Sequence, residues 1–228
     1  MKICILSDIH GNYEALKKCV NEAKKLNINR FFCLGDYVGY YYEPDKCIDL
    51  LKKINAVCIK GNHEDMLLNI LKDNQKVNYY KLKYGNGIKI AYKKLKQRHI
   101  NFIKKLPKTK KVILKGKKFL LCHGSPWNTN EYIYPNKFKL FKNKLNTYKY
   151  DYIFLGHTHI QMKKKINNKI ILNPGSVGQP RDGGLSAKWL VLDFDKKKYD
   201  FKKTSFDYKK IIKQVYFYDK TKKNLIKH

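Results

Sequence analysis

Five short apolar runs in this chain each lead into an aspartate, an asparagine or a histidine. The runs are KICILS, FFCLG, AVCIKG, KFLLCHG and YIFLG, and the polar residues are Asp8, Asp36, Asn62, His123 and His157. Apolar runs of this length, bounded by polar residues, are typical of buried strands. Between the first three runs, residues 13–26 and 44–54 carry apolar residues at spacings of three and four, which predicts helices. Strands and helices that alternate in this way indicate βαβ units and a largely parallel inner sheet.

The second half of the chain has a different pattern. Residues 87–106 are rich in lysine and end at Pro107, so a helix is expected within a helical insertion or cap over residues 80–107. A hairpin is expected at 161–173 with its turn at Asn167-Asn168, and a second at 188–203 with its turn at Lys196–Lys198. A last helix is expected at 207–217. With no internal repeat or linker, we expect one domain, residues 1–228, with an α/β fold of two packed sheets.

The composition of the chain indicates the compartment in which the protein is expected. The chain is 43% hydrophobic, yet no apolar stretch approaches the roughly 20 residues that a membrane span needs. Asp8 follows the first apolar run too early for a signal peptide. The six cysteines form no CxxC pair, which agrees with a reducing compartment. We therefore expect a cytoplasmic protein without membrane partners.

The formal net charge of +32 raises the question of nucleic-acid binding. Of 50 basic residues only three are arginine, and Asn, Ile and Tyr are also abundant, as an AT-rich coding sequence would produce. The lysines are spread over most of the chain. We interpret the charge mainly as compositional drift on a solvated surface. It should help a small anionic substrate to approach, and no sequence-specific nucleic-acid binding is expected.

Polar residues gather where the predicted strands end, at the edge of an α/β sheet where ligands bind. The set holds five of the chain's seven histidines and comprises Asp8, His10, Asp36, Asn62, His63, His123, His157 and His159. Imidazole, carboxylate and amide oxygen together suit Mn, Fe, Zn, Co or Ni better than Ca. Seven ligands from this set of eight are too many for one ion and fit two that share a carboxylate. Paired divalent ions of this kind activate water and orient a phosphoryl displacement.

The motifs D-x-H, G-D-x-x-G, G-N-H-E, H and G-H-x-H occur in this order between residues 8 and 159. In this respect the chain resembles the calcineurin-like metallophosphoesterase superfamily, and NPGSVGQPRDG (173–183) is similar to its small prokaryotic phosphodiesterase members. The resemblance implies a two-sheet α/β/β/α sandwich. It also implies one metal held by Asp8, His10, Asp36 and His159, and a second held by Asp36, Asn62, His123 and His157. His63 would then face the scissile phosphate, with Asp36 beside it.

Each motif also has a structural interpretation. The sequence GDYVG could be a turn whose glycines allow positive φ, and GNHE could be a helix N-terminus. Arg181 could contact phosphate or form a salt bridge within its own loop. His99 and His228 fit no motif and are expected on the surface.

The resemblance implies a phosphoesterase that uses two divalent ions, with Mn expected, and acts on a phosphodiester or a nucleotide. No arginine follows closely after GNHE, although serine/threonine phosphoprotein phosphatases carry one there. That alternative is therefore less favoured than a symmetrical dinucleoside tetraphosphatase. A non-catalytic metal-binding scaffold and a nuclease are further alternatives. The physiological substrate, the native metal and any homo-oligomer are left open.

Overall fold

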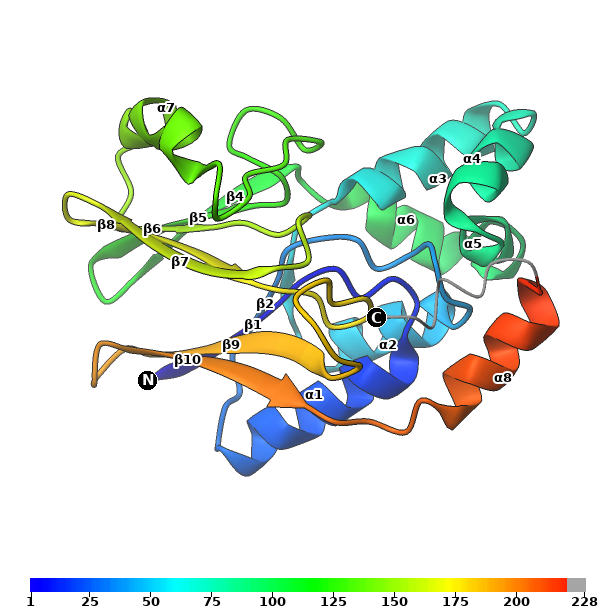
Figure 1. The fold of residues 1–228 in the computed structure, drawn as a ribbon, viewed down its shortest axis with the longest axis horizontal. Coiled ribbons are helices and arrows are strands. Elements are labelled where there is room, and N and C mark those ends of the chain that lie inside the picture. The colour runs from blue at the N-terminus through cyan, green and yellow to red at the C-terminus, as the bar shows by residue number, and fades with distance from the viewer. Residues whose placement is uncertain (221–228) are drawn as a thin grey trace.

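Two five-stranded sheets pack face to face in this computed structural model, which describes residues 1–220 (Figure 1). The first sheet has the order β10-β9-β1-β2-β3, with β1 (Lys2–Leu6), β2 (Phe31–Cys33), β3 (Val57–Cys58), β9 (Ala187–Asp193) and β10 (Lys198–Thr204). The second has the order β4-β5-β6-β8-β7, with β4 (Thr109–Leu114), β5 (Lys117–Cys122), β6 (Tyr152–Phe154), β7 (Gln161–Ile166) and β8 (Lys169–Pro174).

The apolar runs form the parallel strands. In the first sheet β1, β2 and β3 are parallel, and in the second β5, β6 and β8 are parallel. Both predicted hairpins are confirmed as β7–β8 and β9–β10. Strand β4 was not predicted, because its lysine-rich sequence lies at an exposed edge and carries no clear alternation.

Helices cover the outer faces of the two sheets. Helices α1 (Tyr13–Lys25) and α2 (Pro44–Lys53) bury one apolar face each in a core that includes Cys4, Leu6 and Cys33 of the first sheet. The 3₁₀ helix η1 (Phe138–Phe141) and helix α7 (Lys142–Asn146) pack in the same way on the second sheet. Between the sheets, side chains such as Phe32 meet Phe119. The four layers confirm the predicted α/β/β/α sandwich.

The helical stretch predicted for 87–106 is two helices rather than one. Helix α5 (Gly87–Lys94) and helix α6 (Gln97–Lys105) are separated by extended backbone at Leu95 and Lys96. Helices α3 (Asn62–Lys72) and α4 (Lys76–Tyr84) precede them, so residues 80–107 are mostly helical. Helices α3, α5 and α6 contribute to the same core as α1 and α2, whereas α4 buries no residue. That the segment acts as an insertion or cap stays a prediction.

The expectation that His99 lies on the surface is wrong. Only 1% of the residue is exposed, although it has no apolar character. Its Nδ1 accepts the Lys96 N–H at 3.1 Å at the start of α6, and its Nε2 lies 3.1 Å from Asp49 Oδ1 on α2. The ring is therefore buried because both nitrogens have polar partners. His228 lies outside the described residues.

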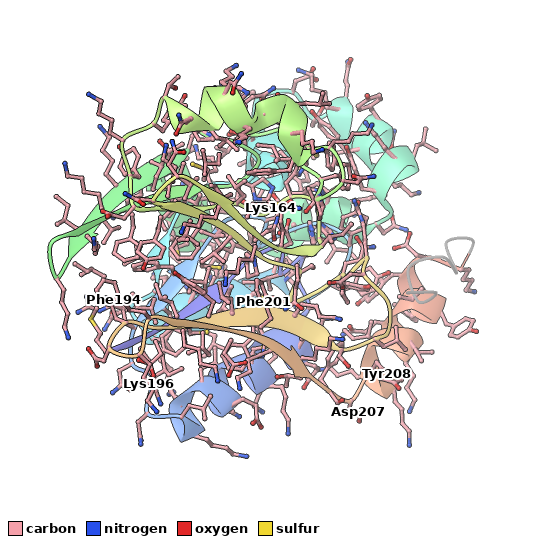
Figure 2. The ribbon with its side chains drawn as sticks, turned by 60° about the vertical axis from the view of Figure 1, so that its left-hand side comes forward. Lys164, Phe194, Lys196, Phe201, Asp207 and Tyr208 are labelled. Carbon is pink, nitrogen blue, oxygen red and sulfur yellow. The ribbon has the colours of Figure 1, made fainter. Side chains whose placement is uncertain are left out.

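The remaining expectations on the chain's elements and surface agree with the structure. The last predicted helix is present as α8 (Lys209–Tyr218). All six cysteines are buried and free. Among the described residues, no helix is both long enough and apolar enough to span a bilayer. Nitrogen-tipped side chains project on every visible side of the molecule, with Lys164 on β7 and Lys196 in the β9–β10 turn as examples (Figure 2).

Candidate metal-binding active site

The eight residues predicted at strand ends meet in one buried cluster. They lie at the carboxyl ends of β1, β2, β5 and β6 and at the start of α3, and none exposes more than 6% of its surface: Asp8, His10, Asp36, Asn62, His63, His123, His157 and His159. We call this set the histidine cluster. Parallel pairing brings the ends of β1 and β2 to one edge of the first sheet and the ends of β5 and β6 to one edge of the second, and these two edges meet at the cluster.

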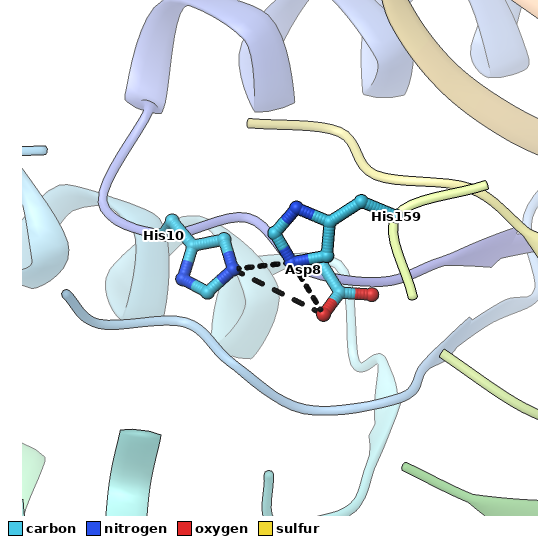
Figure 3. A group of neighbouring side chains, drawn as sticks. All are labelled: Asp8, His10 and His159. Atoms are coloured by element: carbon cyan, nitrogen blue, oxygen red, sulfur yellow. Dashed lines mark hydrogen bonds and ion pairs between the residues drawn. The ribbon is translucent and has the colours of Figure 1, made fainter. Parts of the chain in front are cut away.

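The first half of the histidine cluster contains Asp8, His10 and His159 (Figure 3). His10 Nδ1 donates to Val38 O at 3.2 Å and His159 Nδ1 donates to Gln179 O at 2.6 Å. Each ring therefore carries its proton on Nδ1 and presents a bare lone pair on Nε2. These two Nε2 atoms are only 3.0 Å apart, and His159 Nε2 lies 3.3 Å from Asp8 Oδ1. Two lone pairs that face each other in this way repel unless a proton or a metal ion lies between them.

The second half repeats this arrangement with Asp36, His123 and His157. His123 Nδ1 donates to Leu34 O at 2.7 Å, and its Nε2 is the ring nitrogen that faces Asn62 Oδ1 at 2.9 Å and Asp36 Oδ2 at 3.3 Å. His157 Nε2 is buried and has no hydrogen-bond partner among residues 1–220. Asp36 Oδ2 also lies 3.7 Å from His10 Nε2, so this carboxylate stands between the two halves.

The buried carboxylates of the histidine cluster also favour the binding of positive charge. Burial works to raise the pKa of Asp8, but His159 and His123 hold it below its usual range. Burial opposes protonation of His123, yet the field of Asp36 raises the pKa of that ring to about 10. Burial, followed by the charge of His123, lowers the pKa of His157 to about 3. Two buried carboxylates thus draw a proton to His123, and a divalent metal would take its place. The donor set fits such an ion.

Five of the eight residues hold a backbone conformation that L-residues rarely adopt. Their φ values are positive: Asp8 53°, His10 52°, Asp36 56°, His157 64° and His159 60°. Each such residue costs about 1 kcal/mol or more, and strain of this kind gathers at functional sites. The backbone at these strand ends therefore directs the side chains toward a common point, at a cost in conformational free energy.

His63 lies beside Asp36 among aromatic rings. Its backbone N–H donates to Asp36 Oδ1 at 2.9 Å, and its ring centroid is 5.2 Å from Tyr40 and 4.9 Å from Tyr84. Tyr84 ends α4, which brings the helical segment to the site. A Cβ atom on Gly39 would overlap His63 Nδ1, so this position of the motif needs glycine. The geometry also groups His63 with His10 and Asp36 as a third set of candidate ligands.

Arg181 lies at the mouth of the cluster. Its Nη2 donates to Tyr40 Oη at 3.3 Å, and its backbone N–H donates to His159 O at 3.1 Å. Among residues 1–220 no carboxylate pairs with its guanidinium, so the salt bridge considered above is not found there. Its positive charge is therefore available at the entrance.

The sequence did not reveal the contacts that hold the cluster in place. Ser176 Oγ donates to Asp8 O at 2.7 Å, and Asn173 Nδ2 donates to Gly156 O at 2.7 Å. Both belong to the NPGSVG stretch, which was noted only for its resemblance. The rings of Tyr40, Tyr84 and Tyr132 were missed entirely, because a tyrosine in a loop or at the end of a helix carries no motif.

Glu64 was interpreted only as a first-turn residue of α3, but it organises the site. Its buried carboxylate accepts the N–H groups of Asp36 at 2.8 Å, Tyr37 at 2.7 Å, Val38 at 3.2 Å and Gly61 at 2.8 Å. Burial, followed by the charge of Asp36, raises the pKa of Glu64 to about 7, while the N–H donors oppose that rise.

We expect Glu64→Gln to lower the free energy of unfolding by about 2–5 kcal/mol, because the amide nitrogen leaves two N–H groups buried without an acceptor at about 1–3 kcal/mol each. Urea unfolding of the metal-free protein measures this loss. Asp65→Asn is the matched control: it breaks only part-exposed pairs with Lys60 and Lys108, at 3.9 and 3.6 Å, and should cost less than about 1 kcal/mol. Equal losses in the two variants would contradict the role of Glu64.

Comparisons with known proteins identify the family of this chain. Residues 1–197 match the calcineurin-like phosphoesterase superfamily domain. The chain is 34% identical over 239 residues to the uncharacterized protein MJ0912 of Methanocaldococcus jannaschii, with 92% of each chain covered. A metallophosphoesterase from Sphaerobacter thermophilus has the same fold, with a TM-score of 0.82, 23% identity and coverage of 99% of this chain and 97% of that one. A structure described as a novel archaeal phosphodiesterase gives a TM-score of 0.55 at 19% identity, covering 89% and 99%. The matched domain and the close relative together show that this chain belongs to the calcineurin-like phosphoesterase superfamily.

Proposed function

We propose that this protein is a phosphodiesterase that uses two divalent metal ions to hydrolyse a small nucleotide-type diester. Membership of the superfamily indicates a phosphoesterase hydrolase. The observation that carries the finer proposal is the pair of lone-pair clusters, Asp8–His10–His159 and Asp36–His123–His157, with the Asp36 carboxylate between them. We expect Mn²⁺ in both, with Fe, Zn, Co or Ni as alternatives.

The chain's own residues bind and orient the substrate. Two divalent ions would lower the pKa of a water molecule and offset the charge of the phosphate. Asp8 and Asp36 return only two negative charges against the four positive charges of two ions, so the site stays cationic. Arg181 adds positive charge at the entrance, and His63 is placed to donate a hydrogen bond or a proton to the leaving oxygen.

A diester is favoured over a phosphoprotein for two reasons. The residues after the G-N-H-E motif are Asp65, Met66 and Leu67, so no arginine stands there to grip a terminal phosphate dianion. Arg98 is paired with Asp49 at 2.8 Å on the outer helices, and Arg30 directly precedes β2, at the opposite end of that strand from Asp36. Of the three arginines, Arg181 is therefore the one beside the cluster. A dinucleoside tetraphosphate, which also lacks a terminal phosphate, is the second candidate.

A scaffold without activity is less favoured, because the ligand set and His63 are both complete and buried. We further propose a small phosphorylated compound as the partner, in the cytoplasm, with neither membrane nor sequence-specific nucleic-acid binding.

The test is a hydrolysis screen with Mn²⁺ present. We expect bis(p-nitrophenyl) phosphate to be hydrolysed with a higher kcat/KM than p-nitrophenyl phosphate, because the monoester dianion demands more positive charge than Arg181 supplies. The same screen should include phosphoserine peptides and a dinucleoside tetraphosphate. Preference for the phosphopeptide, or no hydrolysis of any ester, would overturn the proposal.

A further inference from the structure

An open groove borders the histidine cluster on the side of His157 and His159. It is lined by Tyr134, Pro135, Asn136, Lys137 and Ile160, and its volume is about 450 Å³. Ile160 directly follows His159, so one wall of the groove is joined to the cluster along the chain. We call it the Tyr134 groove. Its size falls within the range of about 300–1,000 Å³ that is usual for small-molecule sites.

A row of aromatic rings connects the cluster to the groove. The ring centroid of Tyr132 lies 3.9 Å from that of His157, and Tyr132 is parallel to Tyr134 within 6° at 5.5 Å. Ile133, between the two tyrosines, is buried in the core of the second sheet, which anchors both rings at the surface. Tyr132 still exposes 42% of its surface. A flat apolar face therefore extends outward from the candidate metal site.

The groove combines this apolar face with polar groups at its rim. Asn136 and Lys137 are both exposed and line the same space as the ring of Tyr134. A nucleobase has the matching chemistry, since its faces stack on aromatic rings and its edges hydrogen-bond to amides such as asparagine. Lys137 and the nearby Arg181 complement the anionic phosphate to which a nucleoside is attached.

We propose that the Tyr134 groove binds the nucleoside of a nucleotide diester whose phosphate lies at the histidine cluster. The proposal rests on the proposed function, because the phosphate is what brings the nucleoside to this edge. The base stacks on Tyr134, with Ile160 beside it and Asn136 at its edge. The groove thus selects nucleotide diesters over diesters with small alkyl groups.

Hydrolysis provides the first measurement. Thymidine 5′-p-nitrophenyl phosphate is compared with methyl p-nitrophenyl phosphate, which has the same leaving group and no nucleoside. Loss of one base-stacking contact corresponds to roughly a 5- to 100-fold change in affinity. We expect Tyr134→Ala to raise KM for the thymidine ester by that factor and to leave KM for the methyl ester unchanged. Tyr134→Phe keeps the ring and should behave like the wild type.

Direct binding separates a failure of the groove from a failure of the proposed function. The phosphonate analogue of thymidine 5′-monophosphate, with carbon in place of the ester oxygen, is titrated by calorimetry against ethylphosphonate. Tighter binding of the thymidine compound, lost in Tyr134→Ala and kept in Tyr216→Ala on α8, supports the groove even if no ester is hydrolysed. Equal affinities would overturn the groove even if diesters are hydrolysed.

A third substrate tests whether the Tyr134 groove binds a nucleoside rather than any apolar group. Cyclohexylmethyl p-nitrophenyl phosphate has an apolar group of bulk similar to a base, without an aromatic face or polar edges. We expect its KM to resemble that of the methyl ester. A KM as low as that of the thymidine ester, with the same response to Tyr134→Ala, would show a general apolar groove and overturn the nucleoside assignment.

Discussion

Removal of divalent metal should reduce diester hydrolysis to the background rate, and Mn²⁺ should restore it. The physical reason is the set of facing lone pairs in the histidine cluster, where His10 Nε2 and His159 Nε2 lie 3.0 Å apart with both protons held on Nδ1. A divalent ion held there would supply the activated water on which the proposed hydrolysis depends. The measurement is kcat after exhaustive dialysis against a chelator and after titration with Mn²⁺, with metal content determined by elemental analysis.

The titration also tests the number of ions. Activity should reach its maximum near two ions per chain, since Asp8–His10–His159 and Asp36–His123–His157 form separate clusters. His99→Gln is a matched control, because His99 is buried outside the cluster and should leave the metal content unchanged. Full activity in metal-free protein, or saturation at a single ion, would contradict the two-metal proposal.

Substitution of His63 should lower kcat without removing metal. We expect His63→Gln to reduce kcat by about 10²–10⁴-fold, the usual contribution of a positioned acid or base. Asn62 and His63 are adjacent, and Asn62 Oδ1 lies 2.9 Å from His123 Nε2, whereas the ring of His63 lies among Tyr40 and Tyr84. The loss should be larger for an alkyl leaving group than for p-nitrophenolate, because only the poor leaving group needs a proton.

His157→Gln is the variant with which His63→Gln is compared. His157 Nε2 is buried without a hydrogen-bond partner in the described part of the chain and belongs to a ligand cluster, so its replacement should remove one ion. Elemental analysis and kcat for poor and good leaving groups should be measured on both variants. If His63→Gln loses metal, His63 is a ligand together with His10 and Asp36. If the variant hydrolyses the substrate with the poor leaving group at the wild-type rate, His63 does not act as an acid.

The sequence alone was sufficient to predict every strand except β4, the first two helices and the residues that gather at the candidate site. Apolar runs and helical spacings depend on each residue's immediate neighbours, so β1, α1, β2 and α2 could be predicted from periodicity. Residues that end neighbouring parallel strands share one edge of a sheet, so the meeting of Asp8 with Asp36, and of His123 with His157, followed from their positions in the chain. The packing of the two sheets then brought these pairs together.

Only the tertiary structure determined which side chains support and surround the site. Glu64 accepts N–H groups 26 to 28 residues away, and Tyr132 meets His157 across a gap of 25 residues, so neither contact has a local pattern. His99 is buried because Asp49 on another helix supplies its partner, which the residues around His99 do not indicate. Periodicity reports whether a residue faces the core, but hydrogen bonds and ring contacts depend on the packing of distant segments. The candidate ligands could therefore be predicted from the sequence. The tyrosine rings around the site, and the Glu64 carboxylate that accepts the N–H groups of residues 36–38, were determined by the tertiary structure.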